Sequence, residues 1–168
     1  MQRQWGVMRQ QLKSSDAHSR NSLRAYINIR AGGVYIMEAN RATAQIEIVN
    51  FGQTPANYVR TFIKAEIRLT DNPPPIPTAA DILADEGDGI PMAPSMAVGR
   101  VVQTDHDVTA EEWEFLEQGK AHLFVWGIIT YKTIFSKSKF TSFIWMNAFP
   151  AAYPGAGLTP FSEGNKAT

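Results

Sequence analysis

The sequence predicts an all-β fold: an antiparallel immunoglobulin-like sandwich with one N-terminal helix and one short helix near residues 110–118. Several segments alternate apolar and polar residues with a period of two, turn-forming residues recur at sandwich-like spacing, and no regular strand–helix–strand order occurs. With 168 residues, the chain has the usual length of one domain. We divide it into an N-terminal helical segment (1–22), the sandwich (23–149) and a coil tail (150–168).

The period-two alternation places the strands. We expect them over residues 23–31, 34–37, 42–50, 56–69, 97–103, 121–131 and 140–148. Gly32-Gly33 is expected to end the first of these strands before the second begins. The segment 121–131 is β-branched and aromatic on both faces, which is typical of a central strand that is buried on both sides.

Two segments have helical features. Residues 1–22 are rich in Gln, Arg and Ser and carry only a weak apolar stripe, which predicts a loose helix. Thr109 and Glu112 have the spacing of a capping box, in which each side chain bonds the other residue's backbone N–H. Because Gly119 suits the C-cap, we expect a short helix over 110–118.

Three connections follow from turn-forming residues. The candidate structural residues of the first turn are Asn50, Gly52, Thr54 and Pro55. An Asn side chain mimics a backbone turn, Gly permits a positive φ and Pro presets its own φ, so we expect Asn50 to lock a corner between two core strands. Residues 71–96, with consecutive prolines and many acids, predict a long exposed loop, and residues 132–139 predict a hairpin tip.

Charge is balanced overall but unevenly distributed. The 16 basic and 16 acidic residues sum to zero, so no global field attracts nucleic acid, and we expect no specific nucleic-acid partner. Residues 1–30 hold six basic residues against one acid, whereas residues 71–119 hold eleven acids against one base. These blocks are interpreted either as solvated faces or, for the basic N-terminus, as a segment that meets an anionic surface such as lipid.

Catalytic and metal-binding patterns do not occur. The chain contains no cysteine, no G-x-S-x-G, no phosphate-binding glycine loop and no H-E-x-x-H. Asp105-His106-Asp107 is interpreted as a turn before the helix cap, and the acids of residues 81–88 do not have the spacing of a calcium loop. We therefore expect no enzyme activity, no catalytic residue, no cofactor and no metal, although a carboxylate pair formed in space stays open.

Aromatic and lysine residues concentrate near the C-terminus. The aromatic residues are Phe124, Trp126, Tyr131, Phe135, Phe140, Phe143 and Trp145. Cross-strand packing in the core is the expected use of these rings, with a platform for sugars or bases as the alternative. Lys132, Lys137 and Lys139 are candidate interaction residues at the hairpin tip, or they keep the tip hydrated.

Three pieces together resemble a known family. They are Leu23-Arg24-Ala25-Tyr26-Ile27, then Asn50 to Ala56, and then Phe124-Val125-Trp126-Gly127-Ile128-Ile129-Thr130-Tyr131. Their order and spacing resemble a family of uncharacterised bacterial proteins with an immunoglobulin-like β-sandwich after a Gln-rich, often membrane-anchored, N-terminal helix. The resemblance implies such a domain near a membrane and brings no catalytic residues. In place of the acid and Phe-Gly turn that usually follow in the family, this chain has Lys132-Thr133-Ile134-Phe135-Ser136.

Three functions follow as hypotheses. The first is a non-catalytic binding or structural module that meets a protein partner, at or near a bacterial membrane, through the loops 71–96 and 132–139. The second is association with an anionic membrane surface through the basic N-terminal segment. The third is a carbohydrate-binding domain or an enzyme. No run of about 18 apolar residues and no apolar signal-peptide core occurs in these residues, and compartment, oligomeric state and partner stay unpredicted.

Overall fold

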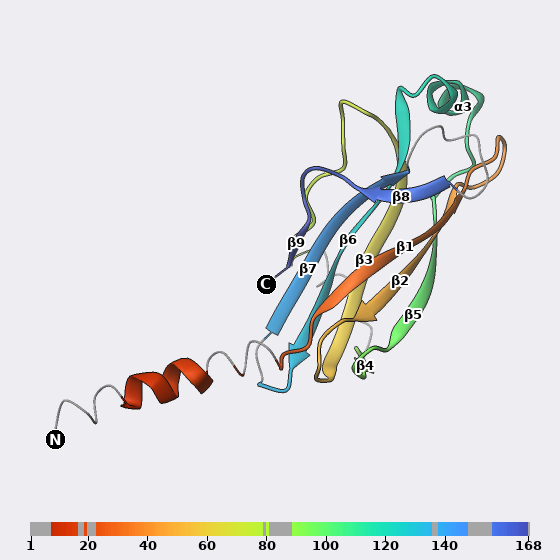
Figure 1. The fold of residues 1–168 in the computed structure, drawn as a ribbon. Helices are drawn as coiled ribbons and strands as arrows, with labels where there is room; N and C mark the ends of the chain where they lie inside the picture. The colour runs from red at the N-terminus through yellow and green to blue at the C-terminus, as the bar shows by residue number, and fades with distance from the viewer. Residues whose placement is uncertain are drawn as a thin grey trace.

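The computed structural model describes residues 8–16, 19, 23–78, 80, 89–135, 138–147 and 156–167, and most of them form one antiparallel sheet (Figure 1). Its strands are β1 (Ile27–Tyr35), β2 (Thr43–Asn50), β3 (Ala56–Leu69), β4 (Ile90–Met92), β5 (Ala97–Gln103), β6 (Ala121–Thr133), β7 (Ser138–Asn147), β8 (Ala156–Pro160) and β9 (Lys166–Ala167). The helix α3 (Ala110–Glu117) connects β5 to β6. The prediction of an all-β antiparallel fold is confirmed.

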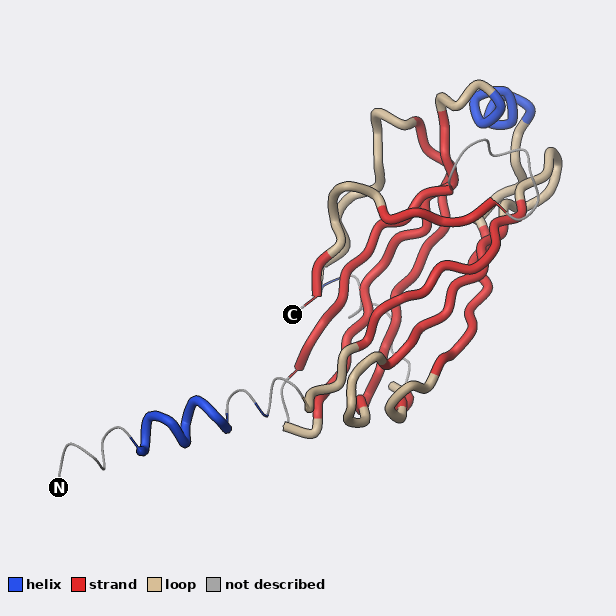
Figure 2. Tube along the Cα trace, in the orientation of Figure 1, coloured by secondary structure: helices blue, strands red, loops and turns tan. Residues whose placement is uncertain are grey.

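The sheet curls until it is nearly closed (Figure 2). Hydrogen-bonded neighbours follow the order β4-β3-β6-β7-β8-β1-β2-β5, and β9 pairs with β7. Strand β8 joins the two halves, because Leu158 pairs with Asn147 of β7 and Gly157 pairs with Gly33 of β1. On the opposite side β3 and β5 are neighbours without a ladder between them, so the sheet stays open along that seam.

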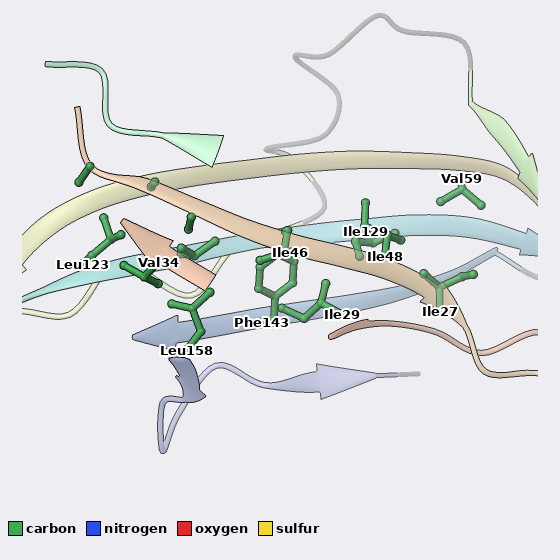
Figure 3. Close-up of a cluster of buried hydrophobic side chains, with 14 of the residues drawn as sticks. Ile27, Ile29, Val34, Ile46, Ile48, Val59, Leu123, Ile129, Phe143 and Leu158 are labelled. Atoms are coloured by element: carbon green, nitrogen blue, oxygen red, sulfur yellow. The ribbon is translucent and has the colours of Figure 1, made fainter. Parts of the chain in front are cut away.

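The core lies between the two halves of the curled sheet, and alternate residues of each strand fill it (Figure 3). Ile27 and Ile29 of β1 meet Ile46 and Ile48 of β2 there, all nearly inaccessible to solvent. Such alternation is what period-two strands require when one face is buried. Strand β2 therefore forms close to the predicted range 42–50, whereas residues 23–26 of the first predicted strand precede β1.

Strand β6 is buried on both faces, as predicted from its composition. Its inner face contributes Leu123 and Val125 to the main core. On the outer face Phe124 and Trp126 form a second cluster, in which the Phe161 ring packs edge-on against Phe124 at 5.6 Å between centroids. The segment between β8 and β9, which contains Phe161, therefore covers the outer face of the central strand β6.

Two predicted boundaries are wrong. Gly32-Gly33 does not break the first strand: β1 continues to Tyr35 with a register shift between Ala31 and Val34, so the glycines form a bulge. A Cβ at Gly32 would lie 2.6 Å from the Gln45 carbonyl oxygen, which explains the glycine. The coil predicted for residues 150–168 is wrong over its described part, because 156–160 and 166–167 are strands.

The loop predicted for residues 71–96 and the short helix predicted for residues 110–118 have different outcomes. Within the predicted loop 71–96, the described residues include strand β4 and the buried Pro74 and Pro77, so this connection is partly packed against the domain. The short helix is confirmed as α3. Residues 8–16 of the N-terminal segment are helical and fully exposed, whereas residues 1–7 lie outside the described part of the chain.

Candidate functional site

The antiparallel topology brings four distant segments to one end of the domain. Register pairs Ile27 with Asn50, Val49 with Ala97, and Ala56 with both Met92 and Thr133. These pairings collect residues 23–26, 50–60, 89–97 and the described part of 130–139, which we name the basic end. The chain enters the domain here from the exposed helical residues 8–16 (Figure 2).

The basic end carries only positive charge. Arg24, Arg60, Lys132 and Lys139 lie on its described residues, and none of those residues is Asp or Glu. The opposite end, made of residues 36–42, 70–78 and 104–120, contains eight acids: Glu38, Asp71, Asp105, Asp107, Glu111, Glu112, Glu114 and Glu117. Arg41 and Lys120 are its two bases apart from His106. In a chain with zero net charge, the described residues thus form one basic end and one acidic end.

Exposed apolar side chains gather on the basic end as well. Six of the large hydrophobic residues that remain substantially exposed belong to it: Leu23, Phe51, Tyr58, Ile90, Met96 and Ile134. The opposite end has two such residues within its ranges, Met37 and Ile76. Single exposed apolar residues are ordinary on protein surfaces, but several at one end beside cations are typical of an interaction site. Phe51 is 52% exposed and Ile134 is 49% exposed, although both follow directly on core strands.

Two aromatic rings of this end lie against cations. The Lys132 Nζ is 4.9 Å from the centre of the Tyr58 ring, and the Arg30 Cζ is 5.9 Å from the centre of the Phe51 ring. Tyr58 has a φ of 53° and lies within a register shift of β3 between Asn57 and Arg60. This bulge turns the Tyr58 side chain out of the sheet, where it is 61% exposed. Such cation–π contacts are worth about 0.5–1 kcal/mol at exposed sites.

Asn50 holds the turns of the basic end together. It is fully buried, and its Oδ1 accepts hydrogen bonds from the backbone N–H of Tyr26 (3.2 Å) and of Gly52 (3.0 Å). Its Nδ2 lies within donating distance of the carbonyl oxygens of Thr54, Met92 and Ala93, at 2.9, 3.2 and 3.3 Å. One side chain therefore bonds the entry to β1, the β2–β3 turn and the β4–β5 turn.

The other predicted turn residues lie beside Asn50. A Cβ at Gly52 would lie 2.3 Å from the Arg24 carbonyl oxygen, so the close approach of the two backbones requires glycine. Pro55 is exposed, and Thr54 Oγ1 is buried without a hydrogen-bond partner among the described residues. The turn is thereby held rigidly while Phe51 projects from it.

The three predicted lysines are not one cluster. Lys132 is exposed on the outer face of β6, where it lines a shallow cavity of about 210 Å³ with Tyr58 and Arg60. Lys139 is half-buried and pairs in register with Tyr131, whose side chain belongs to the core. Lys137 lies outside the described residues. Sequence reasoning missed Phe51, Tyr58 and Ile134. For Phe51 and Ile134 the available signal is an apolar residue within a turn, whereas Tyr58 lies within β3 and gives no such signal.

His106 and His122 form hydrogen bonds with neighbouring side chains. His106 Nδ1 lies 2.6 Å from Asp105 Oδ1, and its Nε2 lies 2.9 Å from Glu112 Oε1. The hydrogen bonds to Asp105 and Glu112 hold the pKa of His106 above its usual value. Burial lowers the pKa of His122, against the opposing effect of its hydrogen bond with Asn147. No group of three metal-ligating side chains suited to a metal ion is found where the chain is described.

Core packing, the use expected of the C-terminal aromatic rings, is confirmed for five of them, so these five offer no accessible platform. Phe124, Trp126, Tyr131 and Phe143 are each at most 5% exposed, and Trp145 is partly buried against the core. A separate cleft of about 610 Å³ lies at the open seam, between Thr61–Ile63 of β3 and Arg100–Gln103 of β5. In the register with β2, Arg100 pairs with the core residue Ile46, so it occupies an inward position of its strand although it is exposed.

No described helix is both long enough and apolar enough to cross a membrane. Comparisons with known proteins add no assignment to this geometry: no protein-family model, no curated protein and no solved structure matches the chain.

Proposed function

We propose that this protein is a non-catalytic binding module that associates with an anionic membrane surface through its basic end. The observation that carries the proposal is the separation of charge among the described residues: Arg24, Arg60, Lys132 and Lys139 lie together with no described acid, while eight described acids lie at the far end. A negative surface attracts the first end and repels the second, so the molecule is oriented as well as bound. The N-terminal segment, with Arg9 and Lys13 on its described helix, joins the same end.

The electrostatic free energy of these basic residues near an anionic surface is large enough for reversible membrane binding. Each basic residue near an anionic surface contributes about 1 kcal/mol, and the attraction falls off within a Debye length of about 10 Å at 0.1 M salt. Four cations of the basic end, added to those of the N-terminal segment, would give a micromolar-range association that weakens as salt is raised.

A second candidate is a module that binds a protein partner. The cleft between β3 and β5 favours it, because two neighbouring strands without a mutual ladder offer backbone groups to an added extended segment. An immunoglobulin-like sandwich remains the proposed finer class of the fold. It is supported by two packed groups of antiparallel strands, β1-β2-β5 and β3-β4-β6-β7, around one core.

The charge proposal is tested by vesicle co-sedimentation. The full chain is mixed with phosphatidylcholine vesicles with or without about 30% phosphatidylglycerol, and the bound fraction is measured at two salt concentrations. The double variant Lys132→Glu/Lys139→Glu reverses two charges of the basic end and should lower the partition coefficient at least about tenfold.

The matched control is Arg41→Glu/Lys120→Glu, which changes the net charge by the same amount at the acidic end. This variant should bind within about twofold of the unmodified protein, because its changed residues face away from the surface. Equal losses in both variants would show that only net charge matters, and absence of binding to anionic vesicles would refute the proposed function.

A further inference from the structure

Six large apolar side chains of the basic end stay exposed among the described residues. Leu23, Phe51, Tyr58, Ile90, Met96 and Ile134 come from the four separate segments of this end, and the fold brings them together beside cations. Simple charge attraction to a surface uses the lysines and arginines and leaves these six side chains in water. Apolar residues with interspersed Lys and Arg and no acids are the composition of segments that lie within the lipid headgroup region.

We propose that Phe51 of the β2–β3 turn, Met96 of the β4–β5 turn and Ile134, which directly follows β6, insert into the interface of an anionic bilayer. This inference rests on the proposed function and deepens it, since it converts adsorption above the headgroups into penetration among them. The occupant of the surface is the lipid bilayer itself, because the described residues of this end combine positive charge, without a carboxylate among them, with exposed apolar side chains.

The aromatic–cation pairs fit this geometry. Lys132 lies against Tyr58 and Arg30 lies against Phe51, so each ring has a cation beside it. In an inserted state the Tyr58 ring occupies the boundary of the acyl chains, while the long Lys132 side chain extends back to the phosphates. Arg30 instead pairs with the Glu47 carboxylate at 3.1 Å and supports the Phe51 ring from the protein side. In water, the contacts with Lys132 and Arg30 stabilise the exposed Tyr58 and Phe51 rings.

Hydrogen bonds hold two of these turns, β2–β3 and β4–β5, in place before any lipid is bound. The hydrogen bonds of Asn50 tie the β2–β3 turn to the β4–β5 turn, and the tight approach at Gly52 fixes the backbone next to Phe51. Insertion therefore needs little ordering of the loops, which would otherwise oppose binding.

Depth is measured with single cysteines, because the sequence contains none. Phe51→Cys and Ile134→Cys carry an environment-sensitive NBD label, and Met37→Cys, which is 40% exposed at the acidic end, is the matched control. With phosphatidylcholine–phosphatidylglycerol vesicles, the labels at positions 51 and 134 should shift to shorter emission wavelengths and be quenched by lipids with a doxyl group on the acyl chain. The label at position 37 should do neither.

A second pair of variants keeps the charge unchanged. Phe51→Ser/Ile134→Ser should weaken vesicle binding about tenfold and make the remaining binding more sensitive to salt, whereas Met37→Ser/Ile76→Ser should not. Retained binding with unresponsive labels at 51 and 134 would refute insertion and leave the electrostatic proposal standing. Loss of all binding to anionic vesicles would refute both, and an equal response at position 37 would refute the orientation.

Discussion

A buried amide at one corner organises the turns of the basic end. Asn50 is inaccessible to solvent, accepts two backbone hydrogen bonds through Oδ1 and is surrounded on its Nδ2 side by three carbonyl oxygens. Asparagine suits this position because one planar group accepts on one side and donates on the other. Aspartate has the same shape but would present a carboxylate to three carbonyl oxygens.

Replacing this amide should be costly. Asn50→Ala should lower the free energy of unfolding by about 2–4 kcal/mol, because several buried backbone groups lose their partners at once. Asn50→Asp should cost at least as much near neutral pH. Urea denaturation provides the measurement, and Asn40→Ala is the control, since the exposed Asn40 has a single side-chain bond of 3.4 Å. Equal effects at the two positions would contradict the role given to Asn50.

At the scale of one element, α3 begins with a polar network that includes a histidine. Thr109 Oγ1 accepts the Glu112 N–H at 3.2 Å, and Glu112 Oε2 accepts the Thr109 N–H at 2.9 Å, as the sequence predicts. His106 extends this capping box by bonding Glu112 and Asp105. The protonated imidazole between two carboxylates stabilises the start of the helix, and the neutral ring does so less.

This network should make stability depend on pH. Because the folded pKa of His106 is raised above its usual value of 6.5, its contribution is fully present below about pH 6.5 and is lost as the pH rises through the folded pKa. The free energy of unfolding of the unmodified chain minus that of His106→Gln should therefore be larger at pH 6 than at pH 8.5, by less than about 1 kcal/mol since the site is exposed. The opposite effect of His122 cancels in this difference. A pH-independent difference would contradict the assignment.

At the scale of the whole molecule, the C-terminal residues complete the sheet. Leu158 of β8 is buried, Phe161 covers Phe124, and the Asn165 side chain bonds both the N–H and the carbonyl of Ile144 at 3.2 Å. An amide that pairs with one backbone residue in this way replaces a neighbouring strand. The segment 156–167 thus joins two halves of the sheet and shields its outer apolar cluster.

Removing this segment should damage the whole domain. Truncation after Gly155 should lower the free energy of unfolding by about 3 kcal/mol or more and expose apolar surface that binds a hydrophobic dye. Removal of residues 1–16 is the control, because the described residues 8–16 are all exposed and should contribute little. Thermal and urea unfolding of the two truncated chains would show the contrast, and an unchanged midpoint after the C-terminal truncation would contradict it.

The strands and the helix whose formation depends on residues close by in the chain are predictable from the sequence. Strands β2 and β3 follow from the alternation of apolar and polar residues, and β6 follows from a continuous apolar run. The helix α3 follows from its capping box and from Gly119, which comes just after the helix end and has a φ of 68°. These features are local, since each residue's environment is set by the residues next to it. The bulge at Gly32-Gly33 and strands β8 and β9 were missed because their partners are distant in the sequence.

Only the tertiary structure decided where charge and exposed apolar surface lie. Lys132 and Arg24 are separated by more than a hundred residues, and the acids of α3 lie between them in the sequence. Antiparallel pairing brings the β2–β3 and β4–β5 turns and the end of β6 to one end of the sheet, and residues 36–42 and 104–120 to the other. Composition therefore predicted a neutral chain, while the pairing of its strands separated the described basic residues of one end from the described acids of the other.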